Sequence, residues 1–400
     1  MVSAELQVAV DVGSARHRIA IGMSGKSLAE FDIGHNPAGL SEFFTRVREQ
    51  ERRHGATVCV AMEGHGGYAR PLDRQVLAEG WRLYAINNLK FARFKEIFPA
   101  PAKTDAIDTR RMLQLMQMRD AMPIAQAVLQ EVAPIDAVHE ELRALTRRRR
   151  QLVEERTRVS QRMQLELQST VPGLLEITGQ ADNLWFLHFL LCKPDLRQVL
   201  KIRRSTLLQI RGIGPKYAEC IGQWQRTALM SSAVRWSGPM IQADARRILA
   251  LRTAIADLEG EIEALTERSS LARRLRSMPG FGEACASELA GEIGNIARFD
   301  DEASLAVYLG AAPLSDSSGK RTGAKIPRQI NSRARDALLR ATVHHMGQVS
   351  LSRTFYERKV AQGKTHLQAV RALARHLVRI IFSMLTHDRD YRLPNAEKNS

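Results

Sequence analysis

The sequence predicts an α/β domain, followed by a long helical segment and a mainly α-helical C-terminal region. In the first region, short apolar runs typical of strands alternate with helically spaced apolar residues, whereas the second region shows only helical spacing. In the third region, a glycine-containing turn precedes an apolar helix. The boundaries that we expect are 1–134, 135–275 with an inserted subdomain at about 172–238, and 276–400.

The first region begins with a predicted β-hairpin. Residues 6–12 are apolar and rich in β-branched side chains, a Gly13-Ser14 turn follows, and residues 18–23 are again strand-like. Later elements alternate in the same way: a helix over 40–53, a buried strand over 57–62, a helix over 71–79 and a strand over 81–86. This alternation predicts a mixed sheet with helices packed on it.

Four carboxylates of this region fall where a metal site could form. Asp11 ends the first strand, and Glu63 ends the buried strand predicted over 57–62. Asp105 and Asp108 share one face of a helix, in the first turn after the expected N-cap Thr104. Mg²⁺ or Mn²⁺ prefers oxygen ligands, and two such ions can stabilise both oxygens of a phosphoryl transfer. Each acid alone is better explained by a helix cap or a solvated charge, so the prediction depends on their joint placement.

A phosphate-binding loop is the rival interpretation of the first acid. The run Asp11-Val12-Gly13-Ser14 resembles the first phosphate loop of sugar kinases and actin-like ATPases. Those proteins need a second D-x-G-[ST] loop much later in the chain, and the sequence has none. The run Asp32-Ile33-Gly34-His35 lies too close to the first and ends in the wrong residue.

Two long helices are predicted in the second region. One spans about 138–167, where Leu145, Leu152 and Val159 recur around the run 147–150 of four arginines. The other carries apolar residues at alternating spacings of three and four: Ile248, Leu251, Ile255, Leu258, Ile262 and Leu265. Such a seam is typical of a coiled coil, so the helices would pair antiparallel or join another subunit. An ordinary amphipathic helix on a core is the alternative.

The inserted subdomain contains Trp185, Trp224 and Trp236, which predict a small core of its own. Glycine-containing turns precede apolar helices at 211–216 and 278–282, and both match the hairpin of a helix-hairpin-helix motif. In that motif, the glycines let backbone amides approach a DNA phosphate at a helix N-terminus. A glycine-rich turn without a binding function is the alternative for each.

Composition points to a nucleic-acid partner. The 400 residues carry a net charge of +16, and excess Lys and Arg favour polyanions through counterion release. The four cysteines lie far apart without a CxxC pair, which argues against a zinc ribbon or a disulfide framework. The sequence shows neither a signal peptide nor a bilayer-spanning stretch, so we expect a cytoplasmic protein with no membrane partner.

A polar loop at 313–321 offers a nucleophile of another kind. It reads Pro-Leu-Ser-Asp-Ser-Ser-Gly-Lys-Arg, and further basic residues follow it. A serine hydroxyl can attack a phosphodiester and hold a covalent phosphoserine link when a base or metal and nearby cations assist it. The loop alone does not identify that serine among Ser315, Ser317 and Ser318, and a plain surface loop is the alternative.

Together these motifs resemble the "one-ten" family of insertion-sequence transposases, over nearly the whole chain. The family's K-T-D-x-x-D is intact at 103–108, and its strand-end aspartate corresponds to Asp11. Its E-A-T-G-x-Y is altered at 63–68, where the Glu, one Gly and the Tyr are kept but Ala-Thr is lost. An Asn-Pro of the family is replaced by Asn87-Asn88.

The C-terminal motifs of the family are also present. Its P-G-h-G, A-E-I-G and R-F correspond to 279–282, 291–294 (here Gly-Glu-Ile-Gly) and 298–299. Its G-L-A-P-x-x-x-x-S-G corresponds to 310–319 with alanine in place of leucine. That alignment singles out Ser318 as the nucleophile, although the adjacent serine leaves the register open by one residue.

The resemblance implies an RNase H/RuvC-like DEDD domain followed by a C-terminal transposase domain. In the implied mechanism, the four acids bind Mg²⁺ and help to activate Ser318, which forms a phosphoserine intermediate with DNA. The implied partners are double-stranded donor and target DNA, a structured non-coding (bridge) RNA that pairs with both, and further copies of the chain in a dimer or tetramer.

Candidate nucleic-acid contacts come from the basic runs and the glycine turns. They are Lys103, Arg147, Arg148, Arg149, Arg150, Lys216, Gly280, Gly282, Lys320, Arg321, Lys325, Arg328, Arg333 and Arg335. A solvated helix face is the alternative for each basic run taken alone.

Three functions compete on these observations. The first is a transposase or site-specific recombinase that uses both the acids and the serine. The second is a metal-dependent endonuclease of the Holliday-junction type without a serine intermediate, for which the first domain would suffice. The third is a nucleic-acid-binding assembly protein with an inactive site, against which the four acids argue. We favour the first, because it accounts for the whole chain.

Overall fold

The computed structural model describes residues 5–64, 69–98, 104–119, 122, 125, 128–312, 314–315, 324–325 and 330–393. The chain divides into two compact units, Met1–Pro134 and Ile135–Ser400. Within the described ranges, no helix has the length and apolar character needed to cross a bilayer.

A mixed sheet of six strands forms the centre of the first unit, with the strand order β3-β2-β1-β4-β5-β6. The strands are β1 (Glu5–Val12), β2 (Arg16–Met23), β3 (Lys26–Gly34), β4 (Thr57–Glu63), β5 (Arg82–Ile86) and β6 (Leu129–Glu131). The first three form an antiparallel meander, β4 and β5 run parallel to β1, and β6 pairs antiparallel with β5. The predicted hairpin and the mixed α/β character are confirmed.

Helices cover both faces of this sheet: α1 (Pro37–His54), α2 (Arg70–Ala78), α3 (Asn88–Glu96) and α4 (Asp105–Gln117). Successive residues of a strand point to opposite faces. Val10 therefore belongs to the core that contains Phe43 of α1, whereas Ala9 belongs to the core that contains Met112 of α4. The face that carries the odd-numbered residues of β1 is the one that α4 covers.

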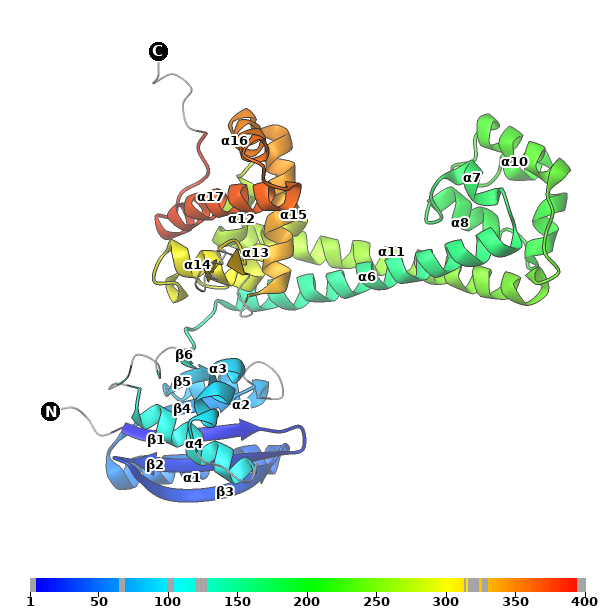
Figure 1. Cartoon of the computed structure of the whole chain (residues 1–400). Helices are drawn as coiled ribbons and strands as arrows, with labels where there is room; N and C mark the ends of the chain where they lie inside the picture. Colours follow the sequence, from blue (N-terminus) through cyan, green and yellow to red (C-terminus); the bar gives the residue numbers. More distant parts are fainter. Residues whose placement is uncertain are drawn as a thin grey trace, which may run out of the picture. The chain divides into compact units, whose positions relative to one another are not determined.

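A stalk of two long helices, α6 (Ala137–Thr170) and α11 (Val234–Arg268), runs through the second unit (Figure 1). The helices are antiparallel, because residues further along α6 pair with residues earlier in α11. The ion pairs are Arg149 with Glu259, Glu155 with Arg247 and Arg162 with Asp244. Leu152, Leu251 and Ile255 pack in the seam. Of the two pairings that the sequence left open, the antiparallel one within the chain is present.

A tip subdomain, residues 171–233, lies between the stalk helices at their far end (Figure 1). Its elements are α7 (Leu174–Thr178), α8 (Leu184–Leu191), the 3₁₀ helix η1 (Leu196–Lys201), α9 (Arg204–Leu207) and α10 (Pro215–Thr227). Trp185 and Trp224 are buried in its core, as predicted. The prediction for Trp236 is wrong, because this side chain is 61% exposed. The insert ends earlier than expected, because α11 already begins at Val234. Trp236 lies outside the buried face of this helix.

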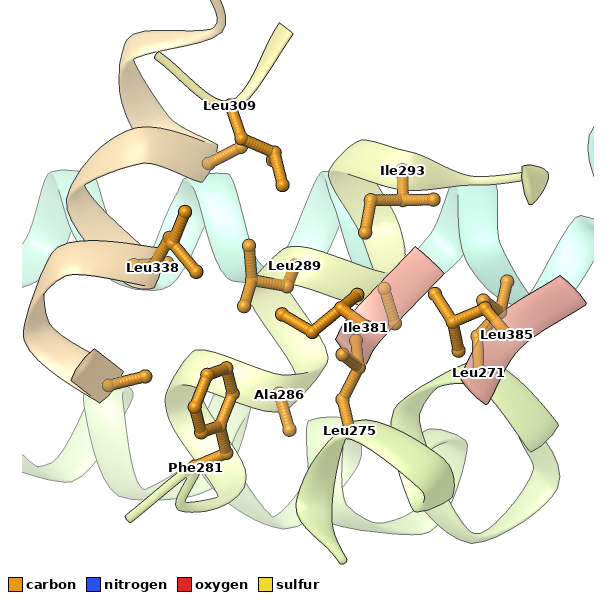
Figure 2. Packing of buried hydrophobic residues seen from close by; sticks show 14 of the residues in the cluster. Leu271, Leu275, Phe281, Ala286, Leu289, Ile293, Leu309, Leu338, Ile381 and Leu385 are labelled. Carbon is orange, nitrogen blue, oxygen red and sulfur yellow. The ribbon is translucent and has the colours of Figure 1, made fainter. Parts of the chain in front are cut away.

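The C-terminal helices pack on the base of the stalk. Their elements are α12 (Ser270–Arg276), α13 (Glu283–Ile293), η2 (Ile296–Arg298), α14 (Glu302–Tyr308), the strands β7 (Leu314–Ser315) and β8 (Ala324–Lys325), α15 (Ser332–Gln348), α16 (Ser350–Ala361) and α17 (His366–Thr386). Val138 of α6 shares a core with Leu289 of α13 and Leu338 of α15. Figure 2 shows Leu289, Leu309 and Leu338 converging in this core. Residues 276–400 therefore belong to the same compact unit as the stalk.

Candidate active site

Asp11 and Glu63 lie side by side at the ends of two neighbouring strands. β1 and β4 are parallel, and their register places Asp11 directly opposite Glu63. Directly opposed residues of paired strands project to the same face of a sheet. That face is the one covered by α4, because Ala9 and Ala61 of the same strands contribute to the core beneath this helix.

Helix α4 brings the other two predicted acids to this face. Thr104 caps its N-terminus as expected, with the side-chain oxygen accepting a hydrogen bond from the Ile107 backbone N–H at 3.3 Å. Asp105 and Asp108 follow in the first turn, where residues three apart are neighbours. Asp105 is exposed and Asp108 is partly buried.

The four acids are close enough to influence one another. The pKa of Asp11 is raised to about 6, first by burial and then by the negative charges of Glu63, Asp105 and Asp108. Lys95 of α3 opposes this shift. Its ammonium Nζ lies 2.7 Å from Oδ2 of Asp108. Lys95 was not predicted from the sequence, because nothing in the spacing of α3 points to an ion pair with α4.

The donor chemistry of this cluster fits a hard divalent cation. All four groups are carboxylates, and a divalent ion would relieve the repulsion that raises the pKa of Asp11. In the ranges that the structure covers, no three acidic, His or Cys side chains converge closely enough to hold a metal as they stand. For Asp108 to become a ligand, it would have to exchange its contact with Lys95 for one with the ion.

The predicted nucleophile lies outside the described residues. This applies to Ser317 and Ser318 and also to Lys103, Lys320, Arg321 and Arg328. Ser315 contributes backbone to β7, which pairs antiparallel with β8 and so with Lys325 and its neighbour. The side chains of these two strands are not described. The catalytic role of Ser318 therefore stays a prediction.

Most arginines of the 147–150 run form ion pairs with acidic side chains of the same unit. Arg147 donates from Nε and Nη2 to Glu292 at 2.7 and 2.8 Å. Arg150 lies 2.7 Å from Glu288, and Arg149 pairs with Glu259. Arg148 bonds Gln151 on the same helix. These pairs hold α6 to its neighbours, which is a structural role that the sequence did not reveal.

The remaining basic candidates are less constrained. Lys216 is exposed at the start of α10, and Arg333 is partly buried in the first turn of α15. Arg335 pairs with Asp336 at 2.9 Å. Whether any of them contacts nucleic acid stays a prediction.

Packing explains one glycine in each predicted hairpin. Gly280 adopts a φ of 80°, and a Cβ there would lie 2.3 Å from the His345 backbone nitrogen of α15. Gly212 has a φ of 89°, and a Cβ there would lie 2.9 Å from the Cβ of Trp185. A Cβ on Gly282 would meet nothing within 4 Å, so packing does not explain this glycine. Phosphate binding at these turns stays a prediction.

Comparisons with known proteins give one consistent result. A transposase family model of the DEDD IS110 type matches residues 8–172, and a model described as transposase of the IS116/IS110/IS902 family matches residues 272–357. The 43.6 kDa protein of insertion element IS110 from Streptomyces coelicolor is 28% identical to this chain and covers 94% of it and 93% of its own length. The 42 kDa protein of insertion element IS900 from Mycobacterium paratuberculosis is 29% identical and covers 94% of both chains. The transposase of insertion sequence IS1111A from Coxiella burnetii is 26% identical over 50% of this chain and 61% of its own.

Proposed function

Because this chain belongs to the IS110-type transposases of insertion sequences, we propose that it cuts and rejoins DNA through a serine nucleophile assisted by a carboxylate metal site. The single observation that carries the metal site is the strand register that sets Asp11 directly opposite Glu63. The raised pKa of Asp11, caused by burial and by the other three acids, supports it. The substrates would be double-stranded donor and target DNA, polyanions that a protein of net charge +16 attracts.

The architecture of the first unit supports an RNase H/RuvC-like assignment. An antiparallel meander of three strands continues into two strands parallel to β1. This arrangement sets Asp11 beside Glu63 at one sheet edge, while the first turn of α4 supplies Asp105 and Asp108. The proposed metal set therefore comes from two strand ends and one helix start.

The proposed chemistry is a pair of transesterifications. The Oγ of Ser318 attacks a phosphodiester phosphorus and forms an O–P bond, while the bond from phosphorus to one nucleotide oxygen breaks and leaves a free hydroxyl. A DNA hydroxyl then attacks the phosphoserine, which restores the DNA backbone and the serine. When bound, Mg²⁺ or Mn²⁺ would stabilise the charge on the attacking and leaving oxygens. The four acids would hold it.

We also propose a bridge RNA and a homo-oligomer, either a dimer or a tetramer, as partners. Both follow from the family resemblance, and the basic charge of the chain is compatible with an RNA partner. Nuclease treatment of the purified protein and its mass in solution would test the two partners separately.

A trapping assay tests the proposed reaction. The protein, purified with its co-expressed RNA, is mixed with Mg²⁺ and labelled DNA carrying the element junction, and the products are separated on a denaturing gel. A protein–DNA adduct should form with the wild type and vanish in Ser318→Ala and in Asp105→Ala. Ser317→Ala and Ser315→Ala, run in parallel, decide the register of the nucleophile.

Asp257→Asn is the matched control, because Asp257 is an exposed acid on α11 of the second unit and is not one of the four proposed metal ligands. It should form adduct at the wild-type rate. Cleavage without any adduct would support the Holliday-junction type of endonuclease, and the role of Ser318 would then be abandoned. No cleavage under any metal would support the nucleic-acid-binding alternative.

A further inference from the structure

The serine-bearing segment, residues 309–330, is tied together at its two ends. Tyr308 is the last residue of α14, and Asn331 is the residue before α15. The Asn331 backbone N–H donates to the Tyr308 carbonyl at 2.8 Å. Further into the segment, β7 pairs antiparallel with β8. The segment therefore leaves and re-enters the helical body at one point.

Just before α15, the side-chain amide of Asn331 both accepts and donates hydrogen bonds. Its Oδ1 accepts from the backbone N–H groups of Arg333 and Ala334, each at 3.1 Å, and so caps α15. Its Nδ2 donates to Oε2 of Glu292 at 2.7 Å and to the Tyr308 hydroxyl at 2.8 Å. That hydroxyl in turn donates to the Glu292 carbonyl at 2.7 Å. Glu292 thus contacts both ends of the segment.

Glu292 is buried, with 1% of its surface exposed, and its charge is matched by Arg147 of the stalk. Two parallel hydrogen bonds at 2.7 and 2.8 Å join the guanidinium to the carboxylate. Burial alone would raise the pKa of Glu292, but the hydrogen bonds from Arg147 and Asn331 outweigh it, and the pKa is lowered. The carboxylate is therefore a fixed charge with both of its oxygens occupied.

A second contact from the stalk reaches the start of α15. Arg150, one helical turn beyond Arg147, lies 3.3 Å from Asp336 and donates to the Arg333 carbonyl at 3.3 Å. Arg147 and Arg150 lie on the same side of α6, because residues three apart on a helix are neighbours. Helix α6 thus contacts Glu292, which in turn bonds Asn331, and it also contacts the start of α15.

We propose that Glu292, held by Arg147 and bonded to Asn331, is a positioning residue that sets the place of the serine-bearing segment for the reaction. The inference rests on the proposed function, since it takes Ser318 as the nucleophile. A nucleophile needs supporting residues, because errors of about 1 Å in its position cost large factors in rate. Glu292 touches neither DNA nor the reacting atoms in this role.

The test separates helix capping from contact with Glu292. Asn331→Ser keeps an oxygen that can cap α15 but lacks the longer amide group whose Nδ2 donates to Glu292, whereas Asn331→Ala removes both. The readout is the first-order rate of adduct formation on DNA that is already bound. Both variants should lower this rate by about tenfold, the size expected when a hydrogen bond to a charged group is lost, while the Kd for DNA stays within about twofold. A rate for Asn331→Ser within about twofold of the wild type would overturn the proposal.

A charge-exchanged pair provides the rescue. In Glu292→Gln with Asn331→Asp, the donor and the acceptor change places, so a hydrogen bond between the two positions is available again and one carboxylate remains. The double variant should react faster than either single variant. Asn295→Ser is the control, because Asn295 caps η2 in the same unit and serine keeps that cap. It should react at the wild-type rate.

Amide hydrogen exchange in β7 and β8 tests the positioning contact independently of whether Ser318 is the nucleophile. Asn331→Ser should speed exchange of the paired amides by about tenfold even in a Ser318→Ala background, because exchange does not depend on chemistry. If no serine substitution affects the adduct but exchange responds as stated, the proposed nucleophile is wrong and the positioning contact stands. Unchanged exchange would overturn the positioning contact whatever the nucleophile.

Discussion

A partly buried carboxylate of the first unit and a buried one of the second unit have pKa values shifted in opposite directions. Around Asp11, four acids gather with Lys95 as a counter-charge, and the pKa of Asp11 rises to about 6. Glu292 of the second unit is almost fully buried, yet its pKa is lowered because Arg147 and Asn331 bond both of its oxygens. Burial raises the pKa of both groups; at Asp11 the neighbouring acids add to that effect, whereas at Glu292 the hydrogen bonds from Arg147 and Asn331 reverse it. A cluster of repelling acids suits the uptake of a cation, whereas a fully bonded carboxylate suits a fixed support.

The largest effect should come from breaking the acidic cluster itself. Asp11→Asn removes a proposed metal ligand, so adduct formation should fall by roughly 10³-fold or more, as for other groups that act as a unit. The thermal transition of the protein should not fall, because the substitution also removes charge repulsion. Rates come from the denaturing gel and transitions from calorimetry, with Asp257→Asn as the control. A rate within tenfold of the wild type would contradict a metal role for Asp11.

Substitution of Glu292, whose two carboxylate oxygens are both hydrogen-bonded, should instead lower the stability of the fold. Glu292→Ala leaves Arg147 and Asn331 without their partner, and we expect the free energy of unfolding to drop by about 2 kcal/mol in urea titrations. Glu259→Ala removes the exposed partner of Arg149 and should cost less than about 0.5 kcal/mol. Equal losses in the two variants would mean that burial adds nothing to the first pair.

The pH dependence of unfolding sharpens the same contrast with a smaller effect. The folded pKa of Glu292 lies below the ordinary glutamate value of 4.5. Its charge therefore stabilises the fold above about pH 4.5, and that contribution is lost as the pH falls through the folded pKa. Glu292→Gln should be less stable than the wild type at pH 7, and the difference should shrink below pH 4.5. A constant difference between pH 7 and pH 3 would rule out this linkage.

The smallest predicted effect concerns Lys95. Its ammonium neutralises Asp108, so Lys95→Met should leave the acidic cluster more negative and tighten Mn²⁺ binding by about threefold in calorimetric titrations. Lys26→Met, which changes an exposed lysine at the start of β3, should leave the Kd for Mn²⁺ unchanged. Weaker binding in Lys95→Met would show instead that Lys95 helps to orient Asp108.

Much of the fold could be predicted because its signals are local. Short apolar runs identified β1 and β4, and a capping residue type identified the start of α4. The edge strands β3 and β6 escaped prediction for physical reasons. β3 is half exposed and carries charged residues, and β6 has only three residues. Trp236 was misplaced because an aromatic side chain favours burial in general but does not specify which face of a helix it occupies.

The site was predictable only in part. Sequence motifs led to the four acids, and the strand register now places Asp11 beside Glu63. The partners of charged groups were not predictable, because they come from far along the chain: Arg147 meets Glu292 across 145 positions. An arginine run looks the same in sequence whether it faces solvent or bonds buried acids. Ser318 remains assigned by motif alone.

The way in which the tip subdomain joins the stalk gives this protein an exchangeable part. α6 ends at Thr170, and the backbone N–H of Ser231, just before α11, donates to the Thr170 carbonyl at 3.0 Å. The chain thus enters and leaves the subdomain through neighbouring points, and closing the gap with a short turn costs little conformational entropy. An exchange of residues 171–233 would have to keep the apolar side chains at the adjoining helix ends, because Met163 of α6 and Ile241 of α11 share the core of this subdomain. A laboratory can graft a reporter there under the same condition.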